Sequence, residues 1–186
     1  MGATGPVVRA AGPADFPAVA QLTLAAYRAD GQLDSDGRYA AVLADVATRA
    51  ADGTVLVAAD PATGELLGSV TFVLPGSRYA EISGPGEAEF RMLAVHPDAQ
   101  GRGVGELLIR SCAERAVRSG RRALVICTRR GFAGVAQRIY ARLGFTRTPE
   151  RDWSPAPGVD LMALRLDLAG ADGVPVGVGS PSGGTG

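Results

Sequence analysis

The chain has 186 residues, a length that favours one compact domain with a real core over two domains. Hydrophobic residues make up 46% and charged residues 20% of it, as in ordinary globular proteins, which argues against disorder or membrane residence of the whole chain. Nineteen basic residues balance nineteen acidic ones, so there is no charge surplus for phosphates, and a dedicated nucleic-acid binder is not expected.

The few cysteine and histidine residues argue against several classes of chemistry. Cys112 and Cys127 are too few for a disulfide framework, and their apolar surroundings favour core packing in a reducing cytoplasm. His96 is the one histidine and gives no metal-ligand spacing with two separated cysteines, so we predict no metal. No apolar run approaches the ~20 residues that span a bilayer, and the first residues lack an export signal, so neither export nor membrane anchoring is expected.

The N-terminal part of the chain predicts a strand, two helices and a hairpin of two strands. These elements span residues 6–11, 15–29, 38–50, 55–59 and 66–74. Apolar residues recur at helical spacing in the first helix, and the polar stretch 31–37 separates it from the second. The hairpin strands are apolar and β-branched, and Pro61 and Gly64 between them suit a turn.

The remaining part predicts strands that alternate with helices. Strands are expected at 88–95, 123–128, 145–147 and 161–168, and helices at 101–119 and about 136–143. The strand 123–128 shows little alternation of apolar and polar residues, which is typical of a central strand covered on both faces. Gly144 is expected to close the last helix as a left-handed cap.

These elements predict one domain over residues 1–168, of mixed α/β class, with helices on both faces of a sheet. Residues 169–186 are rich in Gly, Pro and Ser. They have little to bury and much backbone entropy to lose, so we predict a disordered tail.

A glycine-rich segment, residues 100–105 (Gln-Gly-Arg-Gly-Val-Gly), stands where a predicted strand passes into a helix. Free backbone N–H groups and the positive end of the helix dipole meet there, glycines admit a close approach, and Arg102 adds a guanidinium for phosphate oxygens. The segment therefore predicts a pyrophosphate site. Its spacing is not that of dinucleotide-binding or ATP-binding loops, and a tight turn without a ligand remains the alternative.

Two motifs carry a resemblance to a known family. The strand of residues 91–97, followed by Gln100-x-x-Gly103-x-Gly105, resembles the acetyl-CoA signature of the Gcn5-related N-acetyltransferases, the GNAT family. Residues 139–145 (Ile-Tyr-Ala-Arg-Leu-Gly-Phe) are similar to the second signature of that family.

The resemblance covers about residues 7–168 and is strongest over 89–145. It implies a GNAT-like fold, in which a central, mostly antiparallel sheet has helices on both faces and its central strands splay apart after a bulge. It also implies acetyl-CoA as the acetyl donor.

The same resemblance implies which residues bind the cofactor. Backbone groups of residues 93–95 would pair with the pantetheine arm in the gap between the splayed strands, and the amides of residues 101–106 would hold the pyrophosphate, as the helix start had indicated. A backbone N–H near Met92 or Leu93 would polarise the thioester carbonyl. The implied cofactor-binding residues are Leu93, Ala94, Val95, Gln100, Gly101, Arg102, Gly103, Val104, Gly105 and Glu106.

Transfer to an alkyl ammonium, whose pKa is ~10.4 for lysine, needs a group that removes a proton. By similarity to the glutamate base of the histone-acetyltransferase branch, Glu89 is the candidate base, with Glu81 and Glu87 as fallbacks; a strand-end glutamate facing solvent is the alternative. Tyr140 is the candidate acid, because a phenol of pKa ~10 is protonated at neutral pH and can donate to a departing thiolate. A tyrosine on the apolar face of its helix is the alternative.

Three positions limit what the resemblance carries over. The asparagine that many members have seven residues before the helix tyrosine is Ala133 here, so one cofactor contact is missing. Thr128 stands where the branch that acetylates ribosomal-protein N-termini has a glutamate base, which disfavours that branch. His96 precedes a proline and is predicted to be a surface turn residue.

The acceptor side is the part on which the sequence says least. Asp30, Asp34 and Asp36 form either an entrance that attracts a cationic amine or a solvated acidic loop. Trp153 either walls the acceptor site or covers the core.

The sequence thus predicts a cytoplasmic enzyme that transfers the acetyl group of acetyl-CoA to a primary amine of a small molecule or peptide by direct attack. Glu89 acts through water as the base, with a water chain alone as the alternative, and Tyr140 is the acid. A homodimer is compatible with it. The alternative function is a non-catalytic acyl-CoA-binding sensor or regulatory module, which would bind the cofactor and release no CoA.

Overall fold

The computed structural model describes residues 5–33, 37–131 and 134–168. Within these residues, eight strands form one sheet. The strands are β1 (Val7–Ala10), β2 (Thr54–Ala59), β3 (Leu66–Val73), β4 (Glu87–Val95), β5 (Ala123–Arg129), β6 (Thr146–Arg147), β7 (Trp153–Ala156) and β8 (Val159–Asp167). The helices are α1 (Phe16–Ala29), α2 (Arg38–Ala44), α3 (Val46–Asp52), α4 (Val104–Arg118) and α5 (Gly134–Leu143), with short 3-10 turns η1 (Pro13–Asp15), η2 (Pro97–Ala99) and η3 (Pro149–Arg151). The predicted tail, 169–186, lies outside the described residues.

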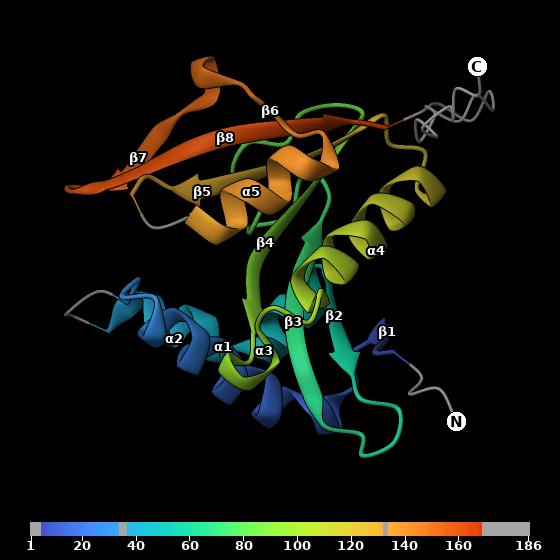
Figure 1. Ribbon diagram of the computed structural model, residues 1–186. Coiled ribbons are helices and arrows are strands. Elements are labelled where there is room, and N and C mark those ends of the chain that lie inside the picture. The colour runs from blue at the N-terminus through green and yellow to red at the C-terminus, as the bar shows by residue number, and fades with distance from the viewer. Residues whose placement is uncertain (1–4, 34–36, 132–133, 169–186) are drawn as a thin grey trace, which may run out of the picture.

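The sheet is open and mostly antiparallel. Its order is β1-β2-β3-β4-β5-β8-β6, with β7 paired to β8 at one side (Figure 1). The pair β4–β5 is parallel, and every other described pair is antiparallel. The predicted mixed α+β class is confirmed, and the predicted hairpin is β2–β3.

Helices cover both faces of the sheet, because the inner strands bury residues on both sides. In β2, Leu56 and Ala58 pack into the core that α4 and α5 cover, while Val55 and Val57 pack against α1 and α3 on the opposite face. Strand residues alternate between the two faces, so a strand that is apolar at every position needs a layer on each side. Figure 1 shows α4 and α5 in front of the sheet.

The start of α4 lies very close to β3, and Gly68 makes this possible. A Cβ at this position would lie 2.9 Å from the carbonyl oxygen of Ala94 and 2.9 Å from the side chain of Val104. No larger side chain fits between the strand and the helix without a shift. Gly68 therefore sets where the N-terminus of α4 lies relative to the end of β4.

The two central strands diverge, as the family resemblance implied. β4 pairs with β5 over three positions, from Glu87 with Ala123 to Glu89 with Val125. On its other side, β4 has a bulge against β3, since Ser69 pairs with Ala94 but Thr71 pairs with Arg91. Met92, inside the bulge, has φ of 54°. The extra residue bends β4 away from β5 and opens a gap between their C-terminal ends.

Three predicted elements differ from the structure. The helix predicted over 101–119 begins only at Val104, because Gly103 (φ 77°) is its N-cap. The helix predicted over 38–50 is broken at Asp45 (φ −80°, ψ 70°), whose carboxylate accepts a hydrogen bond from the Thr48 N–H at 3.1 Å and so begins α3 as a separate helix. The last strand begins at Val159 rather than 161, because Gly158 (φ 76°) turns the chain back into a hairpin with β7, a strand that was not predicted.

Candidate active site

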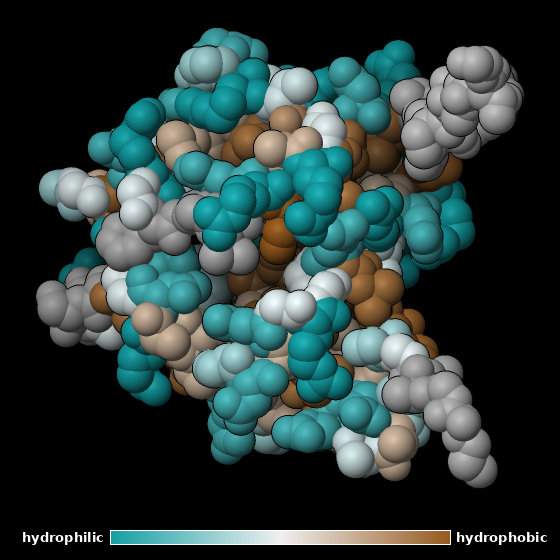
Figure 2. Space-filling model, viewed as in Figure 1, coloured by the Kyte–Doolittle hydropathy of each residue, from teal (hydrophilic) through white to brown (hydrophobic). Residues whose placement is uncertain are grey.

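A cleft of about 1540 Å³ opens where β4 and β5 separate. Its walls come from α1, α2 and the loop before β4 on one side, and from β5 and α5 on the other, with the glycine-rich loop at one end. Figure 2 shows the hollow near the middle of this face, with apolar residues in its depth and polar residues at its rim. Such a cleft, largely apolar with a few polar groups, is typical of a small-molecule site.

The end of β4 forms one edge of this cleft. Leu93, Ala94 and Val95 line it, and residues 126–129 of β5 line it opposite them. The pairing of β4 with β5 ends at Glu89, so the edge of β4 that would face β5 is not occupied by that strand over these residues. An extended ligand can therefore lie against the backbone there, as predicted.

The glycine-rich loop forms one end of the cleft. Gly101 (φ 75°) and Gly103 (φ 77°) have left-handed backbone conformations, and a Cβ at either would meet no atom within 4 Å. Gly103 is the N-cap of α4 and has no side chain to accept from the first amides of the helix. The N–H groups at the start of this 15-residue helix are thus available to an anion.

The predicted cofactor residues are largely brought together here. Gln100, Gly101, Gly103, Val104, Gly105 and Glu106 line the cleft with the β4 residues. Arg102 is exposed and lies outside the cleft wall that the described residues form, so its predicted grip on phosphate oxygens is not supported. Arg138 and Arg142 of α5 line the cleft instead, and Arg142 pairs with Glu106.

Tyr140 lies at the junction of α5 and the sheet, on the wall of the cleft. It is 4% exposed, and its ring packs against Phe90 and Phe145, with ring centroids 6.1 and 5.5 Å away. Burial raises the pKa of its phenol well above the ordinary value. The hydroxyl is therefore protonated at any physiological pH.

Glu81 is the carboxylate of the β3–β4 loop that lines the cleft. Its Oε1 lies 2.5 Å from Nη2 of Arg91, and both side chains are 15% exposed. Burial raises the pKa of Glu81 to about 6, with Glu89 adding to the rise and Arg91 opposing it. A carboxylate with a pKa near neutrality, at the wall of a cleft, is suited to general-base chemistry.

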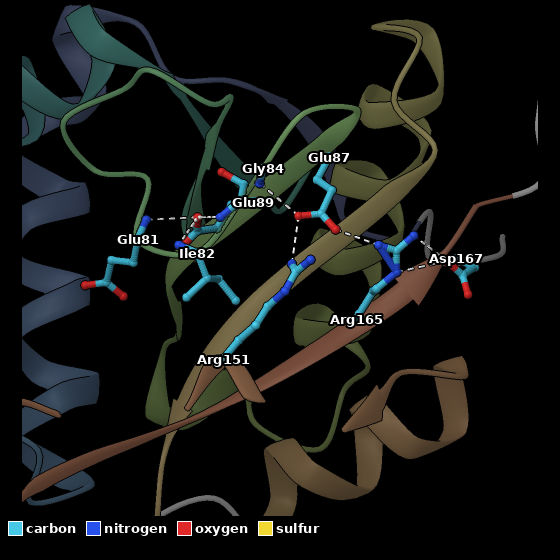
Figure 3. A network of polar contacts seen from close by, with 9 residues as sticks. Glu81, Ile82, Gly84, Glu87, Glu89, Arg151, Arg165 and Asp167 are labelled. Carbon is cyan, nitrogen blue, oxygen red and sulfur yellow. Dashed lines mark hydrogen bonds and ion pairs between the residues drawn. The ribbon is translucent and has the colours of Figure 1, made fainter. Parts of the chain in front are cut away.

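Glu89 does not lie at the cleft. It is fully buried, and its Oε2 accepts hydrogen bonds from the backbone N–H groups of Glu81, Ile82 and Ser83 at 3.0 to 3.1 Å (Figure 3). Its Oε1 has no hydrogen-bond partner among the described residues. The prediction of Glu89 as base is thus corrected, because its carboxylate is inside the protein, not at the cleft, and binds backbone.

A family model described as "Acetyltransferase (GNAT) domain" matches residues 51–147, which is more than half of the chain. The chain belongs to the GNAT family. No curated protein matches it significantly in sequence.

Solved GNAT-type structures share the fold at low sequence identity. An acetyltransferase of the GNAT family from Staphylococcus aureus is 12% identical with a TM-score of 0.68, covering 88% of this chain and 99% of that one. The histone acetyltransferase HPA2 and related acetyltransferase of Corynebacterium glutamicum is 22% identical with a TM-score of 0.67, covering 89% and 98%. The protein yncA from Salmonella typhimurium, solved with its cofactor acetyl-CoA, is 23% identical with a TM-score of 0.61, covering 93% and 99%.

The residues of this GNAT chain fit acetyl-CoA. The glycine loop and the α4 amides would hold the pyrophosphate, and the free edge of residues 93–95 would hold the pantetheine arm. Within the described residues no group of three His, Cys, Asp or Glu side chains could hold a metal ion, and the absence of a metal stays a prediction. No helix of the described chain is long and apolar enough to cross a bilayer.

Glu87, the second fallback base, is also a structural residue. It is 4% exposed and its oxygens accept from Arg165 of β8 at 2.5 Å, Arg151 of η3 at 2.8 Å and the N–H of Gly84 at 2.9 Å (Figure 3). Burial would raise the pKa of Glu87, but the hydrogen bonds from Arg151, Gly84 and Arg165 hold it below its ordinary value. The residue ties β4 to the C-terminal strands.

Other predicted residues have varied positions in the GNAT fold. His96 caps η2, since its Nδ1 accepts from the N–H of Asp98 at 3.2 Å, as expected of a turn residue. Thr128 and Asp30 line the cleft. Trp153, in β7, is 37% exposed and lies outside the wall that the described residues form. Ala133, Asp34 and Asp36 lie outside the described residues.

The cysteines also differ from each other. Cys112 lies on the buried face of α4, where burial raises the pKa of its thiol, and the prediction of core packing is confirmed. Cys127 of β5 lines the cleft instead. Burial raises the pKa of its thiol to about 12, so it is a poor nucleophile at neutral pH.

Sequence reasoning did not find Arg91, Tyr27 and Tyr39, which line the cleft. The two tyrosine rings, from α1 and α2, are 5.8 Å apart in an edge-to-face arrangement. The charged Arg91 inside an apolar strand was the one available signal, because a buried arginine needs a partner.

Proposed function

We propose that this GNAT protein transfers the acetyl group of acetyl-CoA to a primary amine by direct attack, with Glu81 as general base and Tyr140 as general acid. One observation carries the proposal: a single cleft joins the glycine loop at the start of α4 to both Glu81 and Tyr140. When bound, acetyl-CoA supplies the acetyl group as a thioester.

Glu81 is suited to remove the proton of the acceptor. An alkyl ammonium must lose a proton before its nitrogen can attack, and the pKa of Glu81, raised to about 6 mainly by burial, leaves the side chain ionised at neutral pH yet more basic than an ordinary carboxylate. Arg91, which pairs with Glu81, keeps the carboxylate in one place.

Tyr140 is suited to protonate the departing sulfur. Its hydroxyl stays protonated because of burial, and a thiolate like that of cysteine, with a pKa of ~8.5, is basic enough to accept a proton from a phenol in the transition state. The ring contacts with Phe90 and Phe145 hold the phenol in its position. No metal is needed for this reaction.

The acceptor in this proposal is an amine of a small molecule or an exposed peptide amine. The acceptor end of the cleft presents two tyrosine rings, Tyr27 and Tyr39, beside Glu81 and Arg91. This combination offers apolar contact together with one carboxylate for the ammonium group. The cytoplasm remains the predicted compartment and a homodimer one compatible assembly.

The test has two steps. Thermal unfolding is measured with acetyl-CoA, NAD and ATP, because a ligand at 100 times its Kd stabilises the folded state by ~2.7 kcal/mol. Amines are then screened for release of free thiol. Stabilisation by acetyl-CoA alone, followed by thiol release with an amine, supports the proposal. Stabilisation without thiol release from any amine favours the alternative, a non-catalytic acyl-CoA-binding module, and no stabilisation contradicts both.

A further inference from the structure

We propose that Glu89 is a positioning residue for the reaction: its buried carboxylate fixes the backbone of residues 81–83 and thereby holds the side chain of Glu81 at the cleft. The inference rests on the proposed role of Glu81 as base. It assigns a function to a buried carboxylate that the chemistry of the cleft does not use directly.

The contact between Glu89 and the loop is unusually complete. One oxygen of a carboxylate that is 0% exposed accepts three consecutive backbone N–H groups, from Glu81 at 3.0 Å and from Ile82 and Ser83 at 3.1 Å. Hydrogen bonds to a charged acceptor are stronger than neutral ones, and a buried carboxylate without donors would be costly. Glu89 therefore keeps its place only with the loop in this conformation.

The loop needs such an anchor because no strand or helix holds residues 81–84. Glu89 and Arg91 stand two residues apart on β4, and they hold Glu81 from two sides. Glu89 binds the backbone N–H of Glu81, while Arg91 binds its carboxylate and donates a second bond to the carbonyl oxygen of Tyr79 at 3.0 Å. Figure 3 shows the Glu81 side chain extending away from Glu89.

The charge of Glu89 also acts on Glu81. The titratable and charged groups that face Glu81 are Arg91 and Glu89 from β4, Tyr39 from α2 and Cys127 from β5. Burial has the largest effect on the pKa of Glu81, Arg91 lowers that pKa, and Glu89 raises it as a like charge. A neutral residue in place of Glu89 should therefore make Glu81 more acidic.

The experiment compares Glu89→Gln with Glu81→Gln and Glu87→Gln. Glutamine keeps the shape of Glu89 and an oxygen for the amides, and its –NH₂ group takes the place of Oε1, which no described residue bonds. Glu87→Gln is the matched control, because Glu87 is a buried glutamate on the same strand that holds Gly84 but does not touch residues 81–83. Folding of every variant is checked by thermal unfolding.

Two readouts are measured for each variant. The first is the pKa of Glu81, followed by carbon-detected NMR titration without substrate, with the signal identified by its loss in Glu81→Gln. The second is the pH profile of kcat/KM with acetyl-CoA and an active amine. In Glu89→Gln we expect the pKa of Glu81, and with it the midpoint of the acid limb, to fall by about 0.5 pH units or more. On the plateau, kcat/KM should fall about tenfold. In Glu87→Gln neither titration should move.

The outcomes separate this inference from the proposed function. If Glu89→Gln titrates and turns over like the wild type, the positioning role is wrong, whatever Glu81→Gln does. If Glu81→Gln keeps full turnover, the proposed base is wrong, although the NMR titration still tests the link between Glu89 and Glu81. Should Glu89→Gln not fold, Glu89→Asp replaces it. This variant keeps the charge, but its side chain is one methylene shorter and no longer reaches the N–H groups of residues 81–83. We therefore expect kcat/KM to fall while the midpoint of the acid limb stays in place. Unchanged turnover would overturn the inference.

Discussion

Glu81 and Arg91 form an ion pair on the wall of the cleft, with 2.5 Å between Oε1 of the carboxylate and Nη2 of the guanidinium. Arg91 alone would lower the pKa of Glu81, but burial outweighs it and leaves the pKa at about 6. The ion pair therefore orients the carboxylate without removing its basicity. This balance gives the first prediction.

Replacing Glu81 by glutamine should lower kcat/KM by about 10²- to 10⁴-fold, the usual contribution of a general base. In the wild type, kcat/KM should rise with pH as Glu81 loses its proton near pH 6 and then level off, because only the ionised carboxylate is a base. The variant should lack this limb. The measurement is thiol release across pH 5 to 9.

Folding provides the control for Glu81→Gln. Because the folded protein raises the pKa of Glu81, the neutral form is favoured by folding, and the ionised form costs stability as pH rises from about 4.5 to 6. A neutral glutamine should thus unfold at a temperature no lower than the wild type at pH 7. Loss of activity together with loss of folding would count against a specific role for the carboxylate.

Tyr140→Phe should lower turnover by about 10²-fold and leave the protein folded. The substitution removes only the hydroxyl, and the ring keeps its contacts with Phe90 and Phe145. Since burial keeps the phenol protonated, its loss should lower kcat at every pH between 6 and 9 rather than shift the profile. Full turnover of Tyr140→Phe at all these pH values is incompatible with Tyr140 as the acid.

Gly103→Ala should weaken acetyl-CoA binding in addition to lowering the stability of the free protein. Alanine at φ 77° costs about 1 to 2 kcal/mol of backbone strain. No atom lies within 4 Å of the added Cβ, so the substitution causes no steric clash inside the protein. Gly64→Ala is the matched control: it has φ 75°, the same open surroundings, and lies in the β2–β3 turn away from the cleft.

Both glycine variants should lose similar stability without ligand. Only Gly103→Ala should then show a reduced rise in Tm when acetyl-CoA is added, because its methyl group stands at the N-cap of α4, where the proposed pyrophosphate site lies. Equal rises in Tm for the two variants and the wild type would mean that the start of α4 does not hold the pyrophosphate.

Asp152→Asn should make the protein less stable at pH 7 by about 1 to 2 kcal/mol. Hydrogen bonds from Arg147, at 2.6 and 2.9 Å, are the main cause that lowers the pKa of Asp152 to about 2, and the N–H of Ala163 adds to it. Since the folded pKa lies below the unfolded one, this stabilisation is present above about pH 4 and is lost as pH falls from 4 to 2.

The free energy of unfolding of wild type and Asp152→Asn should therefore converge between pH 4 and 2. Asp167→Asn serves as comparison, because Asp167 also pairs with an arginine, Arg165, at 2.7 Å, but its side chain is 80% exposed. An exposed pair contributes little, so this variant should stay within about 0.5 kcal/mol of wild type. A pH-independent difference for Asp152→Asn would contradict the shifted pKa.

Local patterns in the sequence were enough to predict the glycine loop, the α5 tyrosine and most of the sheet. Glycines before an amphipathic stretch mark a helix start, and the spacing of Ile139, Tyr140 and Leu143 places them on one face of a helix, whatever the rest of the chain does. The run of apolar residues in β5 predicted burial on both faces in the same way. These features depend on neighbours in the chain.

The break between α2 and α3 and the strand β7 were not predicted, because their sequence patterns give weak signals. Asp45 ends one helix by capping the next, and aspartate inside a helical pattern gives a weak signal, since it is tolerated on a solvated face. β7 contains Pro155 and is exposed along its length, so its pattern is not that of a strand. Only its pairing with β8 makes it one.

The identity of the candidate base was decided by tertiary structure. In the sequence, Glu81, Glu87 and Glu89 are three carboxylates within nine residues, and the resemblance favoured the last. β4 is buried at Glu87 and Glu89, and the backbone N–H groups of residues 81–83 donate to Glu89, whereas Glu81 lies at the cleft. Which carboxylate faces the cleft depends on contacts between segments that are distant along the chain or lie in irregular loops, and no residue pattern along the chain encodes them.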